Sequence, residues 1–118
     1  MSILGVTCLR NEGPYVVDWL AHHLAAGFDH MLVLTHDCDD GADDLLDALG
    51  ADGRITHLPF EYTADKTVQW QALNIAKKHP LVKAADWVMF FDCDEYLCLP
   101  EPYLRLPDLI ADMPVGAE

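Results

Sequence analysis

The chain has 118 residues, 52% of them hydrophobic, and a formal net charge of −13 at pH 7. This length and composition predict one domain, residues 1–118, with a hydrophobic core of its own. Seven Lys and Arg against twenty Asp and Glu exclude binding of nucleic acid through its phosphates. No apolar run approaches the ~20 residues of a membrane span and the first residues do not resemble a signal peptide, so we expect no transmembrane segment and a cytoplasmic location.

Apolar runs alternate with helical patterns along the whole chain. We expect strands at 3–9, 31–34, 54–58 and 87–91, and helices near 15–26, around Leu45–Leu49, near 66–79 and near 107–113. This order predicts an α/β fold of three layers, in which a mostly parallel, Rossmann-like sheet carries helices on both faces. The run Trp87–Phe91 is apolar without a break, which indicates a strand buried on both faces inside that sheet.

Polar residues follow three of the expected strands directly. They form the segments Arg10–Glu12, His36–Asp40 and Asp92–Glu95. In an open parallel sheet, ligands bind beyond the carboxyl ends of the strands. The three segments should therefore meet at one edge and form one site.

The last of these segments contains two carboxylates separated by one residue. If the backbone stays extended, Asp92 and Asp94 point to the same face, about 7 Å apart. Two carboxylates so close remain ionised most easily when they share a divalent cation. A second triplet, Asp37–Asp39, shows that the spacing alone is weak evidence, but only the first follows an apolar run and is extended by Glu95. The alternative is a solvated acidic turn.

The chain resembles the nucleotide-sugar-binding half of a family 2-type glycosyltransferase with the GT-A fold, from the first strand to about Leu97. The resemblance depends on the segments Cys8–Glu12, Trp19–His23, Asp37–Gly41, Gln71–Leu73 and Trp87–Leu97. His36, Asp39 and Ala42 depart from the residues common in that family. The acceptor site and the general base of such enzymes lie in a following half, so we assign no base and expect a truncated piece of a longer enzyme.

The resemblance implies a metal-dependent transfer of a sugar from a nucleoside-diphosphate donor, of UDP or GDP type, to an unknown acceptor, with inversion. It implies substrate-binding roles for Arg10, Asn11, Glu12, Asp37, Asp40, Gln71 and Asp92. It also implies Mn²⁺ or Mg²⁺ at Asp92 and Asp94, with Glu95 supporting these residues. Oxygen ligands favour these ions over zinc.

Several other interpretations stay open from the sequence alone. The chain could be a noncatalytic nucleotide-binding fragment or a partner-binding module, or a nucleotidyltransferase, although it has no Gly-rich loop with a Lys for a triphosphate. A surface ion pair could explain Arg10 and Glu12, and a solvent-facing amide pair could explain Gln71 and Asn74.

His22 and His23 are interpreted as helix-face residues, and Trp19 and Trp87 as core. A zinc site would use His36, Cys38, Cys93 and Cys98, although reduced thiols facing inward are the expectation. The oligomeric state is open.

Overall fold

The computed structural model describes residues 1–114. Four strands alternate with helices along the chain. In order they are β1 (Ile3–Leu9), α1 (Gly13–Ala26), β2 (His30–Thr35), α2 (Ala42–Leu49), the short 3₁₀ helix η1 (Gly50–Asp52), β3 (Ile55–Pro59), α3 (Val68–Ala76), α4 (Pro80–Ala84), β4 (Trp87–Phe90) and α5 (Leu106–Ala111).

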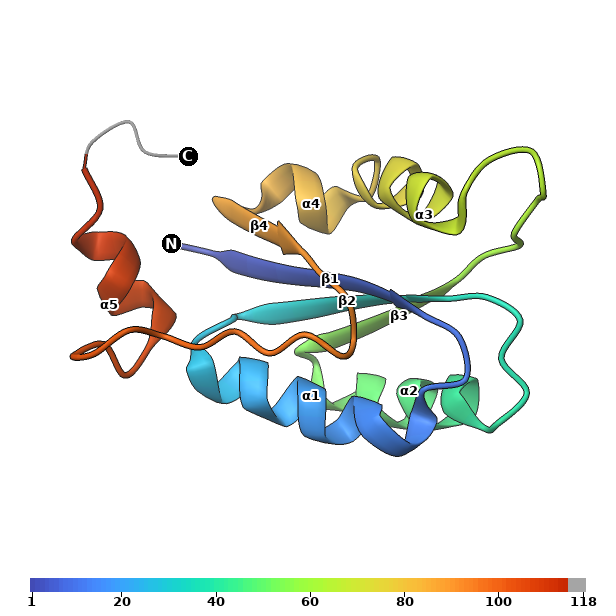
Figure 1. Cartoon of the computed structure of the whole chain (residues 1–118), viewed down its shortest axis with the longest axis horizontal. Helices are drawn as coiled ribbons and strands as arrows, with labels where there is room; N and C mark the ends of the chain where they lie inside the picture. Colours follow the sequence, from blue (N-terminus) through green and yellow to red (C-terminus); the bar gives the residue numbers. More distant parts are fainter. Residues whose placement is uncertain (115–118) are drawn as a thin grey trace.

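The strands form one sheet in the order β3-β2-β1-β4, and every pair is parallel. Helices α1 and α2 cover one face of this sheet, and α3 and α4 cover the other (Figure 1). The expected α/β class, with a Rossmann-like parallel sheet between two helical layers, is confirmed. All four strands therefore end at the same edge, and that edge positions the loops described below.

The core consists of two clusters, one on each face of the sheet. Because side chains alternate along a strand, Ile3 and Leu9 of β1 pack toward α1 and α2, whereas Leu4 and Val6 pack toward α3 and α4. The first cluster is the larger and includes Trp19 of α1. The sheet is thus buried on both faces along its central strands.

The outermost strand β4 does not fit the expectation of a strand inside the sheet. It pairs with β1 only, and Val88 and Met89 keep 44% and 38% of their surface exposed. The prediction of burial on both faces was wrong for the sheet formed by residues 1–114. An apolar run indicates a surface that becomes buried, but it does not show which neighbour buries it.

The helix expected near 66–79 is α3, and a further short helix, α4, follows it that was not expected. Thr67 caps α3 by accepting a hydrogen bond from the Trp70 backbone N–H at 3.1 Å, so the helix begins at Val68. The helical turns end before Pro80, which then occupies the first position of α4. Proline is tolerated there because the first helical N–H has no intrahelical partner.

The end of α1 is fixed by a close contact with the start of α5. Gly27 has φ 118°. Its left-handed backbone lets its own N–H reach the Leu24 carbonyl and lets the Phe28 N–H reach the His23 carbonyl. A Cβ atom at Gly27 would lie 2.5 Å from Cδ of Pro107. Glycine at this position therefore permits both the turn and the docking of the α5 segment.

We predict that Gly27→Ala lowers the free energy of unfolding by more than Gly53→Ala does. Both glycines have positive φ, so each substitution costs about 1–2 kcal/mol for the backbone conformation. Only Gly27 adds a clash, because nothing lies within 4 Å of a Cβ at Gly53. Urea denaturation of the two variants measures the difference, and equal losses would contradict the contact with Pro107.

Candidate functional site

The three polar segments meet at one edge of the sheet. One cleft there is lined by Arg10 and Glu12 after β1, His36 after β2, and Asp92 after β4, and Gln69 of α3 completes its wall. These residues come from segments up to 82 positions apart, which the parallel sheet gathers because its strands end together. The convergence expected from the sequence is present in the structure.

Hydrogen bonds from backbone N–H groups to side chains join the loops after β1 and β2. The Asn11 side-chain oxygen accepts from the Asp39 N–H at 2.8 Å, and Asp40 accepts from the Gly13 N–H at 3.0 Å. Asn11 and Asp37 both adopt positive φ, at 55° and 51°. Non-glycine residues hold this conformation only where their surroundings fix it. The Asp40 carboxylate thus accepts hydrogen bonds from backbone N–H groups, whereas Asp37 lines a cleft.

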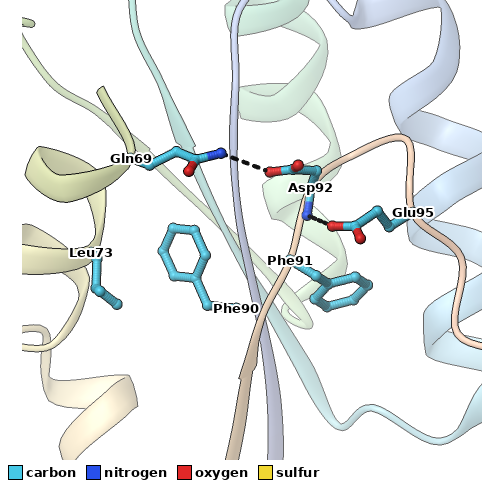
Figure 2. Close-up of a pocket in the computed structure, with 6 residues that line it drawn as sticks. All are labelled: Gln69, Leu73, Phe90, Phe91, Asp92 and Glu95. Atoms are coloured by element: carbon cyan, nitrogen blue, oxygen red, sulfur yellow. Dashed lines mark hydrogen bonds between the residues drawn. The ribbon is translucent and has the colours of Figure 1, made fainter. Parts of the chain in front are cut away.

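The loop after β4 turns sharply at the two carboxylates. The Glu95 N–H donates to the Asp92 carbonyl at 3.0 Å, and the Asp92 N–H donates to the Glu95 carboxylate at 2.9 Å (Figure 2). The backbone between Asp92 and Asp94 is therefore not extended. The expectation that both side chains share one face was wrong, because Glu95 folds the segment into a turn.

Asp92 and Asp94 line different clefts. Asp92 accepts a 3.4 Å hydrogen bond from the Gln69 amide and faces the cleft shown in Figure 2. Asp94 lies in a second cleft with Tyr15 and Tyr96. Glu12 is common to the Asp94 cleft and to the cleft that contains Arg10 and Asp92. The two aspartates are therefore linked through Glu12 rather than through a shared face.

Of the two glutamines at the start of α3, Gln69 faces the rim. Gln71 instead holds the preceding loop, since its amide donates to the Lys66 carbonyl at 3.0 Å and its oxygen accepts from the Thr63 N–H at 3.1 Å. Sequence reasoning selected Gln71 and missed Gln69. Their spacing of two residues places them on different sides of a helix, which periodicity alone could not orient.

The rim is electrostatically negative. Burial raises the pKa of Glu12, and the nearby charges of Asp94 and Asp92 raise it further, while a hydrogen bond with Cys93 lowers it. Burial also raises the pKa of Cys8 and of Cys93 to about 12, and neighbouring negative charges add to both shifts. These cysteines are therefore protonated thiols at neutral pH.

Within residues 1–114, no three His, Cys, Asp or Glu side chains are gathered in a way that could hold a metal ion. Arg10 and Glu12 form no ion pair in that part of the chain; the Arg10 guanidinium instead donates to the Asp37 carbonyl at 3.5 Å. Cys98 is exposed near His22, away from Cys93 in the Asp94 cleft. The chemistry of the rim is therefore that of carboxylate oxygens.

The cleft that Asp37 lines lies beside the end of β2. His36, Phe60 and Tyr62 form a group of rings, with centroids 5.6 and 5.7 Å from the His36 ring. Asp37 and Asp43 supply carboxylates to the same cleft. His36 also lines the cleft of Arg10 and Asp92, so the two clefts adjoin.

Polar side-chain atoms of helix α1 hold the Asp92–Glu95 turn and the residues that follow it, as far as Leu97. The Trp19 indole N–H donates to the Glu95 carbonyl at 2.8 Å, and the His23 Nε2 atom accepts from the Leu97 N–H at 3.1 Å. His22 lies 2.9 Å from the Leu97 carbonyl. Trp19 and His23 are fully buried, so their polar atoms require such partners.

Sequence reasoning had placed these residues on the helix face or in the core, which is correct for their burial but misses their contacts. The available signal was the spacing of Trp19 and His23, four residues apart on an otherwise apolar stripe. Buried ring nitrogens need partners, and a turn rich in backbone donors and acceptors supplies them. We call Trp19, His22 and His23 the α1 clamp.

This is a protein of the α/β class with clefts beyond the carboxyl ends of a parallel sheet. The model of glycosyltransferase family 92 matches residues 7–116. The chain therefore belongs to glycosyltransferase family 92. The expected resemblance to a glycosyltransferase is confirmed at that level, while its assignment to family 2 is replaced by family 92.

A glycosyltransferase family 92 protein of Oryza sativa subsp. japonica is similar to this chain, with 21% identity over 100 residues. The similar region covers 84% of this chain and 16% of the rice protein. The chain thus spans about one sixth of the length of that relative. Among residues 1–114, no helix is both long and apolar enough to cross a membrane.

We predict that the stability contributed by His23 is lost in acid. Burial lowers the pKa of His23, and the neutral ring donates to the Trp19 carbonyl while accepting from Leu97. Since the unfolded pKa is about 6.5, the unfolded chain takes up the proton first as pH falls, and the free energy of unfolding decreases below that pH.

Urea denaturation between pH 5 and 8, compared between the wild type and His23→Gln, measures this effect. The variant should be less stable at pH 8 and should lose less additional stability below pH 6.5. His22 and Tyr96 are the titratable neighbours whose rings contact His23, and both remain in the variant. Identical pH profiles would show that His23 does not act as a neutral partner of the loop.

Proposed function

We propose that this chain is the donor-binding part of a glycosyltransferase and that its parallel sheet belongs to a GT-A fold. The observation that supports this best is the meeting of three loops in adjoining clefts at the carboxyl edge of the sheet, in a member of glycosyltransferase family 92. The donor is a nucleoside-diphosphate sugar of UDP or GDP type. Its sugar passes to an acceptor.

The nucleoside of the donor occupies the cleft beside β2. The rings of His36, Phe60 and Tyr62 offer apolar faces to a flat base, and the exposed carboxylate of Asp37 accepts from base or ribose hydroxyl and amino groups. A base and a ribose are neutral, which suits the acidic cleft. Asn11 fixes this wall through its bond to Asp39.

The diphosphate lies at the neighbouring cleft, where Arg10 faces Glu12 and Asp92. One guanidinium does not neutralise a diphosphate beside the carboxylates of Glu12 and Asp92, so we infer a divalent cation, Mn²⁺ or Mg²⁺, at Asp94 and Asp92. Magnesium is commonly held by one or two carboxylates together with substrate phosphates, rather than by a cage of protein ligands. Asp92 and Asp94, in clefts that share Glu12, would supply the carboxylates of such an arrangement.

The residues of the chain have two roles in the transfer. Arg10 and the nucleoside cleft orient the donor, while the α1 clamp and Glu95 hold the turn that carries Asp92 and Asp94. When bound, the cation supplies Lewis-acid stabilisation of the leaving nucleoside diphosphate. We expect inversion at the anomeric carbon, and we assign no general base to this chain.

A second candidate function is binding without transfer. The similar region covers only 16% of the rice protein, so a chain of this length alone could bind a nucleotide without completing the reaction. Hydrolysis of a UDP-sugar or GDP-sugar by the purified chain separates the two. We expect slow, metal-dependent hydrolysis that is lost in Asp94→Asn, and binding without hydrolysis would favour the noncatalytic interpretation.

We predict that UDP or GDP binds this chain more tightly in the presence of Mn²⁺ and that Asp94→Asn removes most of the difference. The substitution keeps the size of the side chain but removes the charge that holds the cation. Titration calorimetry with and without Mn²⁺ measures both affinities. We expect a loss of at least tenfold, about 1.4 kcal/mol, in the presence of the metal.

The matched control is Asp108→Asn on α5, an exposed aspartate that lines none of the clefts of the rim. It removes the same charge from the same acidic protein and should leave the affinity unchanged. An affinity for UDP and GDP that does not depend on metal, and that is equal in Asp94→Asn and the wild type, would contradict the proposed role of Asp94.

A further inference from the structure

A buried histidine lies directly behind the cleft that we assign to the nucleoside. His57 is in β3, and only 4% of its side chain is exposed. Its Nδ1 atom lies 2.7 Å from a carboxylate oxygen of Asp47, and its Nε2 atom lies 2.7 Å from the hydroxyl of Thr35 and 3.1 Å from Asp43. The Thr35 hydroxyl donates to the same Asp43 oxygen at 2.7 Å.

Both ring nitrogens of His57 have hydrogen-bond partners. The carboxylate of Asp47 can only accept, so the Nδ1 atom donates to it. The Nε2 atom meets the Thr35 hydroxyl, which in turn donates to Asp43. The ring therefore joins α2 to the last residue of β2.

Two of its three partners also line the nucleoside cleft. Thr35 and Asp43 form part of the wall that contains His36 and Asp37, whereas Asp47 points to solvent with 69% of its side chain exposed. Thr35 is the last residue of β2, and Asp37 follows it two positions later with φ 51°. The His57 ring thus holds the base of the strained loop from which Asp37 projects.

We propose that His57 is a positioning residue for the nucleoside cleft: it fixes Thr35 and Asp43, and through them the loop of His36 and Asp37. This inference rests on the proposed function, since it assigns the cleft to a nucleoside. His57 itself does not touch the ligand. Its role differs from that of a surface ion pair, because the ring is enclosed and both of its nitrogens have hydrogen-bond partners.

The positioning role is tested by nucleotide affinity and by the backbone amide signals of the loop. We expect His57→Gln to shift the signals of His36 and Asp37 and to weaken UDP or GDP binding about tenfold, the effect of a lost buried hydrogen bond. Thr35→Val should give the same direction of change, while Thr35→Ser, which retains the hydroxyl, should restore affinity close to that of the wild type.

Asp44→Asn is the matched control, because Asp44 lies on α2 beside Asp43 but is not a partner of His57. It should leave the loop signals and the affinity unchanged. Unchanged loop signals in a folded His57→Gln protein would overturn the positioning role. If the wild type binds neither UDP nor GDP, the proposed function fails, whereas the loop signals of His36 and Asp37 still decide the role of His57.

Discussion

The parallel pairing of β1 with both β2 and β4 is the constraint on which the site depends. It makes three strands end at one edge, and the chain places a polar segment after each of these strands. The crossover helices that parallel pairing requires then cover both faces of the sheet (Figure 1). Fold and site thus have one origin, since any strand reversed in this sheet would carry its polar loop to the opposite edge.

The same edge concentrates negative charge, and the protein stabilises it with backbone and buried polar contacts rather than with lysine or arginine. The Asp92 turn is held by Glu95 and by the α1 clamp, and the loop of Asp37 is held by Asn11 and the His57 network. These contacts leave the exposed carboxylates of Asp37 and Asp94 facing clefts. Such a rim is suited to a ligand that is neutral at one end and bound through a cation at the other.

Sequence patterns were sufficient for the strands but not for the partners of individual side chains. Alternating apolar runs gave the four strands, and the rule for parallel sheets brought Arg10, His36 and Asp92 together. The turn between Asp92 and Asp94 was missed, because it depends on the Glu95 carboxylate reaching back to a backbone N–H. Gln69 and Gln71 could not be distinguished, since periodicity does not show which helix face meets the rim. The exposure of β4 was missed for a related reason, because an apolar run does not show which element packs against it.

The buried rings show how a core can determine the geometry of a site. Trp19 and His23 are as buried as any leucine of the core, yet each has a polar atom that must be satisfied, and both find partners in the loop that carries Asp94. An apolar residue at either position would pack, but it would not fix the height or the direction of that loop. His57 acts in the same way behind the loop of Asp37. In both places a ring nitrogen links the packed interior to an acidic segment, so the core determines where the carboxylates point.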